Sequence, residues 1–108
     1  MIIEQPNFVI IDKLSSGDKE VRNLILDVLK SEFPIEKETY YNCFNSNDVE
    51  KTKEIVHKLK HKISILGLEK CYEKANDYEH NLVKKSFEGH KDFDGILILI
   101  SEFIKKLD

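Results

Sequence analysis

Along most of this chain, apolar residues recur every three or four positions, a spacing that predicts amphipathic helices rather than strands. Asp18, just after Gly17, is placed to cap a first long helix. The apolar stripe of that helix reaches Phe33 and contains Val21, Leu24, Ile25, Val28 and Leu29. Pro34 is expected to kink or restart the helix. Its apolar face then continues through Tyr40, Tyr41 and Phe44.

Three further helices follow from the same spacing. Turn-forming residues occupy 45–48, and Asn47 with Glu50 has capping-box spacing, so a helix is predicted over 49–66. Gly67 breaks that helix, and the next one is expected to close at Gly89. Its apolar positions are Leu68, Cys71, Ala75, Tyr78 and Leu82. A final helix, with Asp92 as its expected cap, carries Phe93, Ile96, Leu97, Ile100, Phe103, Ile104 and Leu107.

The segment 8–16 is ambiguous, because Val9, Ile10 and Ile11 are β-branched whereas Phe8, Ile11 and Leu14 have helical spacing. We interpret it as a short packing helix. Four amphipathic helices with short connections then predict an all-α fold, an antiparallel (up-and-down) four-helix bundle with a short extra N-terminal helix. One domain is expected over residues 1–108, with the core bundle at about 18–108.

Composition narrows the classes of function. The chain has 108 residues, 41% of them hydrophobic, and 17 Lys and Arg against 20 Asp and Glu, for a net charge of -3. This balance lacks the basic excess of a nucleic-acid binder, and the longest apolar run, 96–100, is too short to cross a bilayer. Cys43 and Cys71 are interpreted as core residues without a redox role. With no leader apparent at Met1, we expect a monomer in a reducing cytoplasm.

The predicted helix over 49–66 carries the candidate chemistry. Its buried face is expected to hold Val56, Leu59, Ile63 and Leu66, with Val49 and Ile55 at the edges. The opposite face is expected to hold Glu50, Lys53, Glu54, His57, Lys60, His61 and Ser64, so both histidines should meet solvent. The segment contains five lysines and two acids, a local +3, which leaves -6 for the rest of the chain.

Lys53 and Lys60, four before and three after, are expected to bracket the His57 imidazole. A cationic stripe around an exposed imidazole suits a phosphoryl group, because ammonium groups stabilise the charge of that group. The plainer alternative is a solvated helix face on which His57 is a bystander. Because Lys60 is assigned to the solvent face, Lys60→Ala should change stability by no more than about 0.5 kcal/mol.

The segment HKLKHKISILG over residues 57–67 resembles the signature of histidine phosphotransfer domains, H-x-L-K-G followed by four variable residues and L-G. The matching positions are His57, Leu59, Lys60, Leu66 and Gly67. Domains of this family are antiparallel four-helix bundles of about this length, with the histidine in mid-helix and a preceding helix that often carries a proline, as at Pro34. The resemblance covers the chain from about Phe8.

The resemblance implies a phosphocarrier rather than a stand-alone enzyme. His57 would take a phosphoryl group from an aspartate of a response-regulator receiver domain, or from a sensor or hybrid histidine kinase, and pass it to another receiver. The receiver brings its own Mg²⁺, so no cofactor and no metal site is expected here. Lys60 would contact phosphoryl oxygens. Glu79 matches a position where the family often places a polar residue that holds the histidine Nδ1–H. The residues expected to face the partner are Lys53, Lys58, His61, Ser64 and Gly67.

Several alternatives remain open at the level of sequence. His61 replaces the glycine of the family signature, so transfer could be slowed, the partner could be adapted, or the domain could dock without transfer. Glu54, His57 and His61 share a helix face and could bind a transition metal, with His80 or His90 as further donors. Glu79 could equally be a half-exposed carboxylate without a role.

Overall fold

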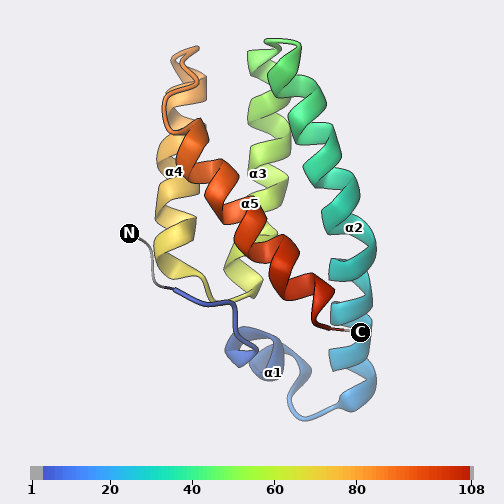
Figure 1. Ribbon diagram of the computed structural model, residues 1–108. Coiled ribbons are helices and arrows are strands. Elements are labelled where there is room, and N and C mark those ends of the chain that lie inside the picture. The colour runs from blue at the N-terminus through green and yellow to red at the C-terminus, as the bar shows by residue number, and fades with distance from the viewer. Residues whose placement is uncertain (1–3, 108) are drawn as a thin grey trace.

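The computed structural model describes residues 4–107, and every regular element in that range is a helix. The elements are α1 (Val9–Ser15), α2 (Lys19–Asn45), α3 (Val49–Ile65), α4 (Glu69–Val83) and α5 (His90–Lys105). In Figure 1, α2, α3 and α4 stand side by side, α5 crosses them obliquely, and α1 lies near the start of α2. The packed pairs are α2 with α3, α3 with α4, α4 with α5, α2 with α5, and α1 with α2. The predicted all-α class is therefore confirmed.

Helix α2 is continuous through Pro34, so of the two expectations, a kink or a restart, the restart is wrong. Asp18 caps it as expected, because its Oδ1 accepts hydrogen bonds from the backbone N–H groups of Glu20 and Val21 at 2.9 and 3.3 Å. Proline removes only one backbone hydrogen bond, and burial of Phe33 and Tyr40 on either side offsets that loss.

The predicted apolar stripe of α2 is only partly buried. Leu29 is in the core, whereas Val21, Leu24 and Val28 are exposed. The first turns of α2 extend alongside the short helix α1, which is too small to cover the whole stripe. The spacing of the apolar residues identified one face of this helix, but it did not show how much of that face is buried by a neighbouring element.

Helix α3 matches its predicted range to within one residue, but its cap is Asp48 rather than Asn47. The Asp48 Oδ1 accepts from the Lys51 N–H at 3.0 Å. Asn47 has φ of +56°, a left-handed conformation that asparagine tolerates better than most residues. Asn47 therefore supplies the turn, and the next residue supplies the cap.

The α4–α5 connection also differs from the prediction. Helix α4 ends at Val83, before Gly89, and Gly89 is itself the N-cap of α5 with φ of +99°. The Asn81 side chain donates to the Glu88 carbonyl at 2.9 Å and closes this connection. Asp92 thus lies in the first turn of α5, where a carboxylate complements the positive end of the helix dipole, and is not its cap.

The core lies where these helices meet. The predicted buried face of α3 is confirmed, because Val56, Leu59, Ile63 and Leu66 are fully buried. Cys71 is in the core as predicted, whereas Cys43 is only half-buried, so its assignment to the core is wrong. Tyr40 from α2 and Tyr78 from α4 bring their hydroxyl oxygens within 2.7 Å of each other, which satisfies two polar groups in an apolar interior.

The segment before α2 closes the α3–α4 turn. Helix α1 is the short packing helix predicted, with Ile11 fully buried. The Asn7 N–H donates to the Leu66 carbonyl at 2.9 Å. Gly67 has φ of +73°, a conformation that favours glycine, and a Cβ there would also lie 2.5 Å from the Asn7 Oδ1, so the Asn7 side chain would have to move.

Glu4 supplies a cap that α4 lacks. The N-cap of α4 is Leu68, which has no capping side chain. The Glu4 carboxylate instead accepts from the Lys70 and Cys71 N–H groups at 2.8 and 2.9 Å. Burial alone would raise the pKa of Glu4, but these two backbone hydrogen bonds outweigh it and lower the pKa below its ordinary value. The N-terminal segment is therefore fastened to the start of α4.

None of the helices within residues 4–107 is both long enough and apolar enough to cross a membrane.

Candidate functional site

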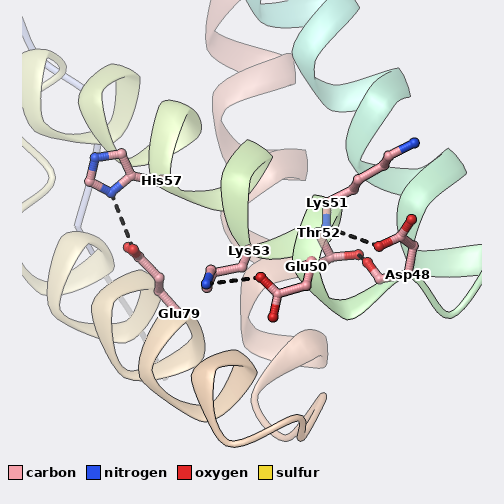
Figure 2. A network of polar contacts seen from close by, with 7 residues as sticks. All are labelled: Asp48, Glu50, Lys51, Thr52, Lys53, His57 and Glu79. Atoms are coloured by element: carbon pink, nitrogen blue, oxygen red, sulfur yellow. Dashed lines mark hydrogen bonds and ion pairs between the residues drawn. The ribbon is translucent and has the colours of Figure 1, made fainter.

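His57 lies on α3 with its side chain 58% exposed, as predicted, and faces a carboxylate from α4. Its Nδ1 is 3.2 Å from the Glu79 Oε2 (Figure 2). Because an ionised carboxylate only accepts hydrogen bonds, the Nδ1 carries the ring proton and donates a hydrogen bond to Glu79. The lone pair of the neutral ring is then on Nε2, the nitrogen on the far side of the ring from Glu79. This contact gives Glu79 the position expected from the family resemblance.

Lys60 does not lie on the solvent face, and the prediction that placed it there is wrong. Its side chain is only 8% exposed, and its Nζ is 2.7 Å from the Glu79 Oε1 and 2.9 Å from the Asn76 Oδ1. The ammonium also lies 5.2 Å from the centroid of the Tyr72 ring. The physical reason is that Lys60 follows Val56 by four residues, and such pairs share one side of a helix. The ammonium therefore points across to α4.

The two oxygens of Glu79 thus serve two different partners. Partial burial alone would raise the pKa of Glu79, but the hydrogen bond and charge of Lys60, followed by those of His57, outweigh it and lower the pKa below its ordinary value. Glu79 is consequently ionised at neutral pH. An ionised Glu79 keeps the Nδ1 of His57 as a hydrogen-bond donor and leaves the lone pair of the ring on Nε2.

Lys53 was predicted to bracket the imidazole, and that prediction is wrong. Its Nζ is 3.2 Å from the Glu50 Oε2, one turn earlier on α3 (Figure 2). Lys53 and the exposed Lys58 nevertheless line, together with His57 and Glu79, a cavity of about 520 Å³ that extends along α3. The surface beside the imidazole therefore offers ammonium groups, although they do not touch the ring.

His61 and Ser64 continue the exposed face that begins at His57, as predicted. The rings of His57 and His61 lie edge to face, with their centroids 5.2 Å apart and their planes at 69°. Gly67 is different, because it is half-buried beneath Asn7 and its place is explained by the α3–α4 turn.

The three-ligand metal site considered from the sequence is not assembled. Within residues 4–107, no group of three or more His, Cys, Asp or Glu side chains is arranged to hold a metal ion. Glu54 lines the same cavity as His57, while His90 packs against the Phe44 ring with centroids 5.0 Å apart. His80 is exposed on α4.

Asn76 is the site residue that reasoning from the sequence missed. It accepts a hydrogen bond from Lys60 and precedes Glu79 by three residues, so both side chains project from one side of α4. That i, i+3 spacing of two polar residues beside the apolar stripe of α4 is a signal that could have identified it. Comparisons of the chain with models of protein families, with curated proteins and with solved structures find no match, so the functional interpretation depends on this geometry and on the signature at 57–67.

Proposed function

We propose that this chain is a histidine phosphotransfer domain of a phosphorelay. His57 accepts a phosphoryl group from a phospho-aspartate of a receiver domain or hybrid kinase and passes it to another receiver. The observation that carries the proposal is the hydrogen bond from the His57 Nδ1 to Glu79, which leaves Nε2 free on an exposed ring. The arrangement of an imidazole oriented by a carboxylate is a general one in nucleophilic catalysis.

The proposed transfer uses the His57 imidazole of this chain, and the phosphoryl donor and the metal ion come from the partner. The Nε2 lone pair of His57 attacks phosphorus, the P–O bond of the aspartyl phosphate breaks, and the aspartate leaves as a carboxylate. The Nδ1 proton stays on the ring, which gains positive charge, and the ionised Glu79 stabilises that charge. The reverse sequence of bonds transfers the group to the next aspartate. The metal for this chemistry is brought by the receiver, and the chain acts as a reaction partner rather than as an enzyme.

Lys60 supports the reaction through Glu79. Its ion pair at 2.7 Å and the hydrogen bond to Asn76 fix the carboxylate on the side of α4 that faces His57. Lys60 is therefore proposed as a positioning residue, in place of the direct contact with phosphoryl oxygens that the resemblance implied.

The surroundings of His57 suit a protein partner with an acidic active site. The imidazole is exposed, and Lys53 and Lys58 border the adjoining cavity. The proposed fold is the single-domain antiparallel four-helix bundle with a short N-terminal helix. In its favour, α3 packs side by side with both α2 and α4, to which it is joined by short connections (Figure 1). His61 and Ser64, which share the exposed face, are proposed to meet the partner.

The proposal is tested by phosphorylating the intact chain in two ways. Phosphoramidate, which phosphorylates imidazoles directly, should label one histidine, and a receiver domain charged with acetyl phosphate and Mg²⁺ should transfer its phosphoryl group to the same residue. The product should be acid-labile and base-stable. His57→Gln should abolish labelling, whereas His80→Gln, which removes an exposed histidine of α4, should not.

Labelling that persists in His57→Gln would overturn the assignment of the acceptor. Labelling by phosphoramidate together with no exchange with any receiver would favour a module that docks without transfer.

A further inference from the structure

A pair of imidazoles one helical turn apart is the feature that the proposed phosphotransfer does not use. His57 and His61 are both exposed on α3, with ring centroids 5.2 Å apart. Histidines at i and i+4 on a helix can bind one metal ion between them. Because a zinc ion lies about 2.0–2.1 Å from each ligating nitrogen, two imidazoles on one tetrahedral ion have centroids separated by about 5 Å. The observed centroid separation of 5.2 Å is close to that value.

The carboxylate behind His57 is a second, independent observation that favours a metal. Histidines that ligate metals almost always donate their other ring N–H to a carboxylate, a carbonyl or water, which fixes the tautomer and raises the basicity of the ligating nitrogen. The His57 Nδ1 donates to Glu79 in this way at 3.2 Å. The nearest buried ammonium, that of Lys60, is already neutralised by Glu79.

We propose that His57 and His61 together bind one divalent transition-metal ion, of the class Zn²⁺, Ni²⁺ or Cu²⁺, with water completing its coordination. Imidazole nitrogens select these ions over Mg²⁺ and Ca²⁺, which prefer oxygen ligands. The ion uses the same Nε2 lone pair of His57 that would attack phosphorus, so a bound ion blocks phosphorylation. The block rests on the proposed function, whereas the metal site does not.

The site is tested by titrating the intact chain with Ni²⁺ and Zn²⁺ in an isothermal calorimeter. One ion should bind per chain, and Mg²⁺ should give no binding under the same conditions. His61→Gln retains His57 and its contact with Glu79, and should weaken binding at least tenfold. His80→Gln, the matched control, should bind as the parent chain does. Equal affinity in the parent and in His61→Gln would overturn the site, provided that circular dichroism shows both chains folded.

The block is tested by labelling with phosphoramidate in the presence and absence of saturating Zn²⁺. Zinc should suppress labelling of His57 in the parent chain, and at the same zinc concentration it should suppress labelling of His61→Gln much less. Undiminished labelling of the zinc-saturated parent would overturn the block. If the parent is not labelled even without metal, the proposed function and the block both fail, while the calorimetric titration still decides the site.

Discussion

The two faces of α3 are built on different principles. The inner face, with Val56, Leu59 and Ile63, is fully buried and is held by apolar contacts with neighbouring helices. The outer face, with His57 and His61, is exposed, and the orientation of His57 depends on one hydrogen bond to α4. The comparison shows that a single 3.6-residue repeat places the three buried apolar residues and the two exposed histidines on different faces of one helix.

Lys60 links these two faces. Its stem is buried with the inner face, while its ammonium is paired with the Glu79 that orients His57. A change at Lys60 should therefore affect both the free energy of unfolding and the site, whereas changes elsewhere on α3 should affect mainly one of them.

The largest expected effect is on the inner face. Leu59→Ala removes a fully buried side chain and should lower the free energy of unfolding by about 2–5 kcal/mol, because it loses apolar burial and leaves a cavity. Urea denaturation followed by circular dichroism measures this. Leu24→Ala on α2, where the side chain is exposed, is the matched control and should change stability by no more than about 0.5 kcal/mol. Similar losses in both variants would contradict the assigned core.

Lys60→Ala should come next, with a loss of about 1–3 kcal/mol, because it removes a largely buried ammonium and leaves the Glu79 charge without its closest partner. Lys53→Ala is the control from the outer face. The Lys53–Glu50 pair is partly exposed, at 32% and 68% of the two side chains, so its loss should cost no more than about 0.5 kcal/mol. Denaturant titrations of both variants measure the two losses in the free energy of unfolding. Equal losses would contradict the burial of Lys60.

A smaller effect should appear in the pH dependence of Glu79→Gln. Since folding lowers the pKa of Glu79, its ionised form contributes stability above the ordinary pKa of 4.5, and that contribution is lost as the pH falls through the lowered pKa of the folded state. The parent should therefore exceed Glu79→Gln in stability at neutral pH, and the difference should shrink in acid. Thermal melts at pH values on both sides of 4.5 measure this. A difference that grows in acid would contradict the shift.

The smallest effect on stability is expected at His57. His57→Gln replaces a side chain that is 58% exposed and retains a donor for Glu79, so it should change the free energy of unfolding by no more than about 0.5 kcal/mol. Phosphorylation should nevertheless disappear. A large loss of stability in this variant would show that the outer face also supports the fold, which would weaken the contrast between the faces of α3.

Local pattern predicted much of this molecule. The five helical segments, the cap at Asp18, the buried face of α3 and the exposure of His57 and His61 all follow from spacing along a single helix. Errors arose at helix ends, where Asn47 and Asp48 are both suitable caps, and on α2, where apolar residues such as Leu24 remain uncovered. A further error was the assignment of Lys60 to the solvent face of α3, since its side chain is buried. In these places the local pattern fits more than one arrangement, and packing against neighbouring elements decides which one forms.

The sequence by itself determined which residues share a helix face, because that depends on positions at most four apart. Only the tertiary structure decided what those faces meet. The Lys60–Glu79 and Lys60–Asn76 contacts join α3 to α4, and Glu4 caps a helix 66 residues further along the chain. Such contacts depend on how two helices are placed and rotated against each other. The packing of the whole core sets that placement, and no local window of the sequence contains it.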